Sequence, residues 1–336
     1  MASLTLATLG TILIDNIRHL DGAEGHLGGG GLYAAIGARM WLQPETVRLP
    51  TGCSRSSVPK KFLDELDQFG ETVWMWDEDS KESMLETEII DARASFRYLN
   101  PRPPLTIACL NAQKIRYLHF CCSPADLAIS LAMLSEPRPR IVYESLPINC
   151  NPANLMALKA ILPLVDVFSP NHEELELFLR GDIESLVSMY AEFGARTIVV
   201  RAGARGCFIS NKNPMLGACD SRWLLPYWTA EEAKENVRET TGAGNSFLGG
   251  LCAGMAIAGG CWTSITDSYA GAAHGSVSAS FVVQQPGLPH FSTGKEETWN
   301  GESPHQRLKI YFPCTYVLTS GQLEEGNARM SSHTTP

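Results

Sequence analysis

The chain has 336 residues, 44% hydrophobic and 19% charged, and this composition excludes a mostly disordered or fibrous protein because it can bury a sizeable core. Its 27 Lys and Arg and 36 Asp and Glu give a formal charge of −9, and so acidic a chain repels phosphate backbones. We therefore expect neither a nucleic-acid partner nor a membrane-surface partner.

Cysteine usage and the N-terminus predict the compartment. None of the ten cysteines forms a CxxC pair, and residues 1–7 lack the basic region of a signal peptide. No apolar run approaches the about 18 residues that span a bilayer. These features predict a reduced, soluble protein of the cytoplasm.

Short β-rich runs alternate with helical patterns along most of the chain. The predicted strands are residues 4–9, 115–120, 140–144, 165–169 and 197–201. Between two of them, apolar residues from Leu155 to Val165 recur at helical spacing. The alternation predicts an α/β fold with a mostly parallel sheet covered by helices, whose ligands bind beyond the carboxyl ends of the strands.

Residues 83–98 break this rhythm, because they alternate like two strands around a turn. We interpret them as a small β-hairpin that projects from the main sheet, and as a candidate lid; an ordinary surface hairpin fits the same pattern. One folded domain is expected over residues 1–320. The polar, aperiodic end, residues 321–336, is expected to be a disordered tail.

The strongest chemical motif is the glycine turn at residues 239–246, which precedes a helix of small residues. Backbone N–H groups of Gly242, Ala243 and Gly244 can converge there, and the helix dipole adds partial positive charge. Such a turn can hold a phosphate or a developing oxyanion. The alternative is a turn that only packs the helix tightly against the sheet.

Three further features fit the same site. Four glycines at residues 28–31 open another small-residue helix, although they follow a His-Leu pair rather than the strand of a dinucleotide-binding unit. Asn171 and Glu174 follow a strand and share a helix face, an arrangement that helix capping alone also explains. Asp15 follows the first strand, where its carboxylate could accept hydrogen bonds from substrate hydroxyls.

Together these motifs resemble the ribokinase-like, or PfkB, family of carbohydrate and nucleoside kinases over residues 10–289. Within that family they resemble a fungal branch named for killer-toxin maintenance. Four family motifs are matched in order, namely the glycine signature at residues 28–31, P-N-x-x-E at 170–174, G-x-x-G at 203–206 and D-T-x-G-A-G-D at 239–245. The resemblance implies a ribokinase-like three-layer sandwich with a mostly parallel central sheet and a small β lid.

The resemblance also implies a reaction, the transfer of the γ-phosphoryl group of ATP to a hydroxyl of a sugar, a nucleoside or a related small molecule. Mg²⁺ would be organised by Asn171 and Glu174. The transferring phosphoryl group would be held by Gly242, Ala243 and Gly244. The residues implied in binding are, for the acceptor, Asp15, Gly28, Gly29 and Tyr33, and, for the nucleotide, Gly203, Gly206 and Thr241. A homodimer formed through the lid is also implied.

The chain departs from the family pattern at the catalytic base, where Asn245 replaces the last Asp of the signature. An amide cannot take the acceptor's proton and can only orient the acceptor, and losing a positioned base costs about 10²–10⁴ in rate. Glu239 replaces the first Asp of the signature, and Tyr33 replaces an Asn near the acceptor. Residues 144–147 stand where many members carry an Asp-x-Asn-type element.

Three functions therefore stay open at this point. The first is a slow or unusual kinase in which Asn245 orients the acceptor. The second is a non-catalytic pseudokinase that binds a ligand. The third is an enzyme that reuses the cleft for another reaction, such as a lyase, glycosidase or cyclisation step in specialised metabolism, since a scaffold does not fix its chemistry.

Overall fold

A nine-stranded sheet forms the centre of the computed structural model, which describes residues 4–19, 22–90, 95–100, 107–111, 113–212, 219–259 and 265–312. The strands from β11 to β5 are parallel, and β12 and β13 add antiparallel strands at one edge. In spatial order the strands are β13 (Cys219–Leu224), β12 (Cys207–Lys212), β11 (Thr197–Arg201), β10 (Val167–Phe168), β9 (Arg140–Ser145), β8 (Ile115–Cys122), β1 (Leu4–Leu9), β4 (Val47–Pro50) and β5 (Trp74–Met75).

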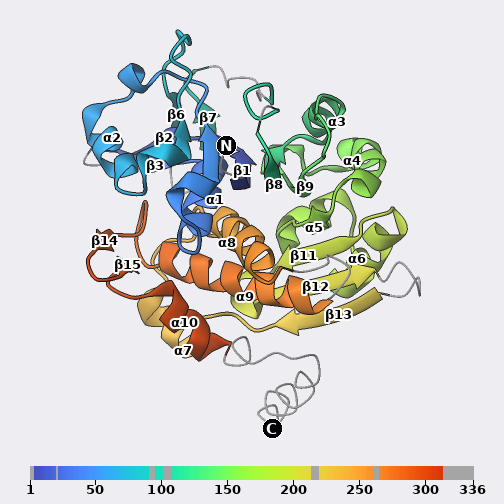
Figure 1. Cartoon of the computed structure of the whole chain (residues 1–336). Helices are drawn as coiled ribbons and strands as arrows, with labels where there is room; N and C mark the ends of the chain where they lie inside the picture. The colour runs from blue at the N-terminus through green and yellow to red at the C-terminus, as the bar shows by residue number, and fades with distance from the viewer. Residues whose placement is uncertain are drawn as a thin grey trace.

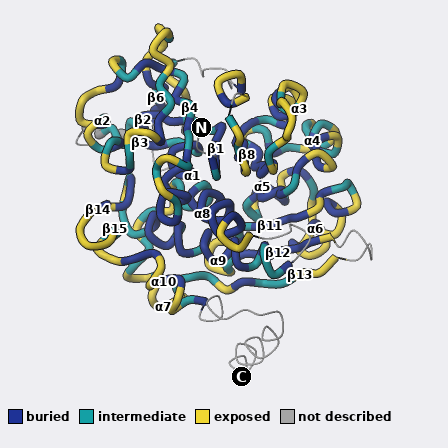
Figure 2. Tube along the Cα trace, viewed as in Figure 1, coloured by how far each residue is buried: buried dark blue, intermediate teal, exposed yellow. Residues whose placement is uncertain are grey.

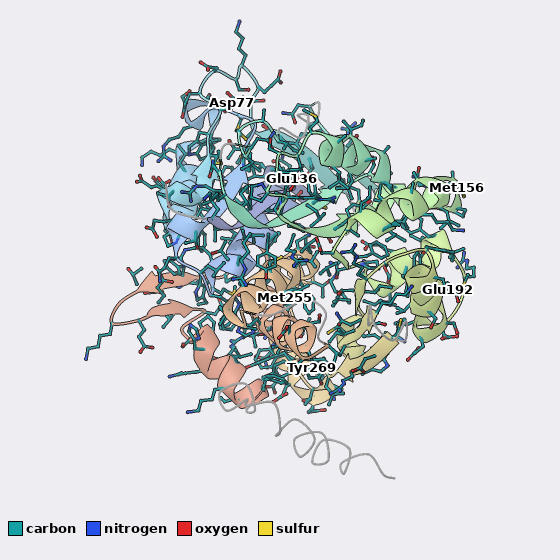
Figure 3. The ribbon with its side chains drawn as sticks, turned by 45° about the vertical axis from the view of Figure 1, so that its right-hand side comes forward. Asp77, Glu136, Met156, Glu192, Met255 and Tyr269 are labelled. Atoms are coloured by element: carbon teal, nitrogen blue, oxygen red, sulfur yellow. The ribbon has the colours of Figure 1, made fainter. Side chains whose placement is uncertain are left out.

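Helices cover both faces of this sheet (Figure 1). Alternate strand residues point to opposite faces, so Tyr117 and Val142 pack with one group of helices and Phe120 and Tyr143 with the other. The first group is α1 (Gly30–Arg39), α8 (Ala243–Ile257), α9 (Ile265–Val282) and α10 (Pro304–Tyr311). The second group is α3 (Pro124–Ala132), α4 (Leu155–Ile161), α5 (His172–Phe178) and α6 (Ile183–Glu192). In Figure 3, Met255 and Tyr269 mark the first group, and Met156 and Glu192 mark the second.

A four-stranded lid sheet lies at one end of the molecule (Figure 1). Its order is β3 (Gly22–Gly28), β2 (Leu13–His19), β6 (Leu85–Ile90) and β7 (Ser95–Tyr98). The antiparallel pair β6 and β7 confirms the predicted hairpin, and β2 and β3 enlarge it into a sheet. Helix α2 (Lys60–Asp67) packs on the Ile14 side of this sheet through Phe62.

Glycines allow α1 and α8 to pack with their backbones in contact. A Cβ at Gly37 would lie 2.0 Å from the carbonyl oxygen of Ser246, and one at Gly249 would lie 1.9 Å from that of Ala34. Helix α8 is buried from Ser246 to Ala256 (Figure 2). This close packing brings the N-termini of the two small-residue helices together at the carboxyl ends of the strands, where Asn245 lies against Gly30.

The sequence predictions agree with most of these elements, and the differences have local causes. The strand predicted at residues 165–169 contains only Val167–Phe168. The helix predicted from Leu155 stops at Ile161 and continues as a 3₁₀ turn, Leu162–Leu164, that contains Pro163. The glycine run follows strand β3 of the lid sheet, which the sequence analysis did not predict.

Smaller elements complete the described part of the chain. They are α7 (Ala230–Asn236), the hairpin of β14 (Phe291–Thr293) and β15 (Glu297–Trp299), and 3₁₀ turns at Pro44–Thr46, Arg55–Ser57, Glu71–Val73, Pro147–Asn149, Pro152–Asn154 and Gly203–Arg205. The tail predicted at residues 321–336 lies outside the described residues. Among the helices that are described, none has the length and apolar character needed to cross a bilayer.

Candidate active site

The glycine turn begins helix α8 and leaves backbone donors available. Gly242 is the N-cap residue, with a φ of 80°, a left-handed conformation that favours glycine. Within the described residues, the N–H groups of Gly244 and Asn245 donate to no protein acceptor. Unpaired N–H groups at the positive end of a helix of 15 residues can hold an anion.

The two sides of this turn face different surroundings. On one side the Tyr33 ring covers Gly242, where a Cβ would come within 2.3 Å of it. On the other side Ala243 and Gly244 line a cavity of about 720 Å³. The turn therefore separates a side lined by Tyr33 from a side that opens into a large cavity.

Glu239 holds the turn in shape. Its Oε1 accepts hydrogen bonds from the backbone N–H groups of Thr240 and Thr241, at 2.8 and 3.0 Å, and from the Thr241 hydroxyl at 2.8 Å. The longer Glu side chain thus serves as a local cap where the family has Asp. The Thr241 hydroxyl is used within the turn, and Thr240 rather than Thr241 lines the cavity.

A buried polar chain lies beneath the turn and centres on Glu144, at the end of β9. Its Oε1 accepts from the side-chain amide of Asn245 and lies 3.1 Å from Nε2 of His119, whose Nδ1 is 2.9 Å from the Thr8 hydroxyl. Its Oε2 accepts from Nη2 of Arg201 at 2.8 Å. Burial alone would raise the pKa of Glu144, but Arg201, His119 and Asn245 together lower it, so the group is a carboxylate at neutral pH.

Arg201 connects this chain to the turn and to the cavity. It ends β11, and its Nη2 also donates to the Ser169 carbonyl at 2.9 Å. Its Nη1 lies against Gly244, 2.1 Å from where a Cβ would be, and its Nε is buried with no hydrogen-bond partner in the described structure. The side chain is 11% exposed and lines the cavity. Nη1 is therefore the nitrogen of Arg201 that can reach a ligand there.

Asn171 and Glu174 form a reciprocal helix cap at the start of α5. The Asn171 side chain accepts from the N–H of Glu174 at 2.8 Å, and Glu174 Oε2 accepts from the N–H of Asn171 at 2.9 Å. The same Oε2 lies 3.5 Å from Nη2 of Arg201. Burial raises the pKa of Glu174 against the opposing effect of Arg201, which disfavours the ionised form that a metal ligand needs.

The residues present fit a resident magnesium ion poorly. Both expected ligands already accept hydrogen bonds, and a guanidinium lies beside Glu174. No group of three or more His, Cys, Asp or Glu side chains suited to a metal occurs in the described ranges. The assignment of Mg²⁺ to Asn171 and Glu174 stays a prediction.

The cavity has the size of a cofactor pocket, for which roughly 300–1,000 Å³ is typical. Arg201, Asn171 and Gly244 are among its polar lining, together with His172, Glu173, Lys234 and Thr240. Its apolar wall includes Tyr227, Trp228, Val237, Phe247 and Val283. Gly203 and Gly206 also line it, with φ values of 55° and 88°, and their contact with a nucleotide stays a prediction.

Asp15 lies in the lid strand β2, next to the glycine run. It is buried, and its Oδ1 accepts from the Thr87 hydroxyl at 2.5 Å. Gly28 makes room for it, because a Cβ there would be 2.0 Å from Asp15 Oδ2; Gly29, with a φ of 106°, has equally little space beside the Thr11 carbonyl. Burial raises the pKa of Asp15, although Thr87 and His26 oppose the shift.

Tyr33 lies close enough to the Asp15 side to feel its charge. Burial raises the pKa of this phenol most, and the carboxylates of Asp15 and Glu239 raise it further. The ring is 3% exposed and packs on Gly242. The Tyr33 side chain therefore lies between the lid carboxylate and the glycine turn.

Sequence reasoning missed the part played by Glu144 and Arg201. The sequence alone leaves Arg201 open between a nucleotide contact and a solvated surface residue, and it favours a satisfied core residue for His119. His119 is indeed buried with both ring nitrogens bonded, but its partners belong to the site. The available signal was a charged residue at the carboxyl end of a buried parallel strand, where ligands bind in such sheets.

A lid carboxylate, a glycine turn and a cofactor-sized cavity at the carboxyl ends of parallel strands define a ribokinase-like class of protein. Comparison with known proteins agrees. Residues 112–292 match the model of the pfkB family carbohydrate kinases. The chain is 31% identical over 350 residues to an uncharacterized protein of Schizosaccharomyces pombe, covering 91% of this chain and 92% of that one. The chain belongs to the pfkB family.

A second relative and several solved structures extend this result. Protein MAK32 of Saccharomyces cerevisiae is 25% identical over 318 residues, 85% of each chain, which is consistent with the killer-maintenance branch. A ribokinase of Giardia lamblia superimposes with a TM-score of 0.67 at 18% identity, covering 85% of this chain and 94% of that one. A putative ribokinase II of E. coli, solved with ATP and Mg²⁺, gives 0.64 at 13% identity, with 93% and 99% coverage. These structures confirm the fold.

Proposed function

We propose that the protein is an ATP-dependent kinase that phosphorylates a hydroxyl of a sugar, a nucleoside or a related small molecule. One observation carries the proposal. The N–H group of Gly244, which donates to no acceptor in the described structure, and Nη1 of Arg201 meet at a cavity that is also lined by large apolar side chains. Such a cavity suits a ligand with an anionic end and a flat apolar end, as a nucleoside triphosphate has.

The acceptor is proposed to bind on the other side of the turn, near Asp15 and Tyr33. Asp15 would accept hydrogen bonds from its hydroxyls, and the oxygen of one hydroxyl would attack the γ-phosphorus while the bond to the bridging β,γ-oxygen breaks. The donors of the turn and Arg201 would stabilise the charge on the transferring group. ADP leaves with the electrons of the broken bond.

The acceptor's proton has no carboxylate to receive it at position 245. In a loose transition state the proton leaves late, so it can pass to the transferred phosphate or to water. We therefore expect turnover about 10²–10⁴ slower than with a positioned base. Asn245 would orient the acceptor through its side-chain oxygen.

A second candidate, a pseudokinase that binds nucleotide without turnover, is favoured by the Asn245–Glu144 hydrogen bond. That bond fixes the side-chain nitrogen of Asn245 on a buried carboxylate, so position 245 is suited to an amide and not to a second carboxylate. The two candidates share the nucleotide site and differ only in turnover.

The first experiment measures the melting temperature with and without MgATP. A rise supports either candidate, and a panel of sugars and nucleosides then separates them, since only the kinase forms ADP in step with a phosphorylated acceptor. An unchanged melting temperature would count against both. It would favour reuse of the cleft for a lyase, glycosidase or cyclisation reaction.

We also propose a cytoplasmic location and a small-molecule substrate, as the resemblance implied, and a homodimer through the lid as a prediction. Because α2 covers the Ile14 side of the lid sheet, a dimer would have to use the opposite side or the strand edges. Sedimentation of the full chain measures its oligomeric state, and a monomer at all concentrations would refute the dimer.

A further inference from the structure

We propose that Arg201 supplies to the bound phosphates the positive charge that a divalent cation held by the protein would otherwise supply. Nucleotide affinity in this chain then depends on Arg201 and hardly on Mg²⁺. The inference rests on the proposed function, because it assumes that the cavity takes a nucleoside polyphosphate. The Mg²⁺ in question is an ion held by protein side chains, not the Mg²⁺ that free ATP carries in solution.

The placement of the guanidinium is the first argument. Its Nη2 is fixed by Glu144 at 2.8 Å and by the Ser169 carbonyl at 2.9 Å. Nη1 lies against Gly244, beside the N–H groups that begin α8, and Nε has no partner within the described residues. A planar guanidinium held on one side presents its remaining donors in the geometry that phosphate oxygens accept. The group is thus oriented before any ligand arrives.

The charges around the guanidinium are the second argument. The carboxyl groups of Glu144 and Glu174 lie 2.8 and 3.5 Å from the same Nη2, so the guanidinium already contacts both. A divalent ion beside Glu174 would have this fixed positive charge as its neighbour, and the repulsion is strong where burial limits screening. The arginine therefore competes with a metal for this position.

The hydrogen bonds of the expected metal ligands are the third argument. Asn171 and Glu174 hold each other's backbone N–H groups, and a metal drawing on the same oxygens would compete with both bonds at the start of α5. Asn171 lines the cavity, so its location near a nucleotide is explained by its place in the wall. Helix capping and the cavity wall therefore explain the positions of Asn171 and Glu174 without a bound ion.

The test measures the affinity of the full-length protein for ADP and for inorganic tripolyphosphate by calorimetry, once in EDTA and once in excess Mg²⁺. We expect the two affinities of the wild type to differ by less than about threefold. Arg201→Met should weaken both ligands by about 10- to 100-fold, the range for a charge-assisted hydrogen bond. Arg140→Met is the matched control, because it removes an arginine at the opposite end of the same sheet, 46% exposed beside Asp166. It should leave the affinities unchanged.

A second variant covers the possibility that Arg201→Met leaves Glu144 unpaired and unfolds the protein. Arg201→Met combined with Glu144→Gln removes both charges and keeps an acceptor for Asn245. Loss of tripolyphosphate affinity in this folded variant supports the proposal. Retained affinity in it, or wild-type binding that requires Mg²⁺, would overturn the role of Arg201 and leave the nucleotide site intact. No binding of ADP by the wild type under either condition would overturn the proposed function as well.

Discussion

Asn245 donates its side-chain amide N–H to Oε1 of Glu144, a buried carboxylate one residue before the end of β9. The other oxygen of Glu144 is bonded to Arg201, so the charge at this point is fixed. An amide at position 245 complements that charge, whereas a carboxylate would oppose it. The surroundings of position 245 therefore fit an amide better than a carboxylate.

Restoring aspartate alone should consequently harm the fold. Asn245→Asp would place two carboxylates in contact, and the pair would keep a proton to a higher pH than either group in the unfolded chain. A raised pKa in the folded state lowers stability as the pH rises through it. We expect a loss of about 1–3 kcal/mol at pH 7 that shrinks towards pH 4, measured by urea unfolding.

The double variant Asn245→Asp with Glu144→Gln tests the same relationship in reverse. It moves the negative charge to position 245, where it can offset Arg201 in place of Glu144, and supplies an amide donor at position 144, so stability should recover relative to either single variant. If the protein is a slow kinase, ADP formation with an accepted substrate should also rise, by up to about 10²–10⁴. Equal stability of the single and double variants would contradict the pairing.

Glu144 should also shape the stability of the wild type in acid. Its pKa is lowered in the folded state, so its contribution is complete above its usual value of 4.5 and is lost as the pH falls through the lower folded value. Glu144→Gln leaves Arg201 with less compensation, and we expect a cost of about 3–5 kcal/mol at pH 7 that diminishes in acid. Unfolding curves between pH 3 and pH 7 measure this difference.

Asp166→Asn is the control for this experiment. Asp166 pairs with Arg140 at 3.1 Å at the other end of β9, where the arginine is half exposed. Screening by solvent limits such a pair to about 0–1 kcal/mol. If Asp166→Asn lowered the free energy of unfolding as much as Glu144→Gln does, burial of Glu144 would not explain its contribution to stability.

Gly242→Ala should damage the proposed nucleotide site through the Tyr33 ring. A left-handed alanine costs about 1–2 kcal/mol anywhere, but here its Cβ would also overlap Tyr33 at 2.3 Å. Gly259 offers the matched control, since its φ is 68° and no described atom lies within 4 Å of a Cβ there. We expect Gly242→Ala to cost about 1–3 kcal/mol more than Gly259→Ala and to be the one that weakens ADP binding.

Denaturant unfolding measures the loss of stability of the two variants, and calorimetry measures their affinity for ADP. Equal costs for the two alanines would mean that the Tyr33 ring moves aside freely. The turn would then be less rigid than its contacts indicate.

Local patterns were enough to predict much of this molecule. The hairpin within residues 83–98 and the strands at 4–9 and 197–201 show the periodicity of their elements and were found. Strand β3 was missed because it contains three glycines, Gly22, Gly25 and Gly28, which have little β propensity. Those glycines are required by what lies across the sheet, since Gly28 gives room to Asp15.

The site's charge network could not be predicted in the same way. Glu144 and Arg201 are 57 residues apart and meet because β9 and β11 flank β10. No sequence period relates them, and a single Glu or Arg in a sequence is most often an exposed surface residue. Asn245, 101 residues from Glu144, was noticed only as a departure from a family signature.

Asp15→Asn should separate function from stability. Burial raises the pKa of Asp15, so its ionisation costs the fold free energy as the pH rises through that value, and an amide of the same shape avoids the cost. The variant should therefore be more stable than the wild type at pH 7 and equal to it in strong acid. Its kcat/KM for an accepted substrate should fall about 10- to 100-fold, because a charged acceptor for the substrate hydroxyls is lost.

Asp182→Asn is the contrasting control. Hydrogen bonds from Ser185 lower the pKa of this exposed helix-cap residue, so the same change should reduce stability and leave kcat/KM unaltered. A fall in stability for both variants would contradict the raised pKa of Asp15.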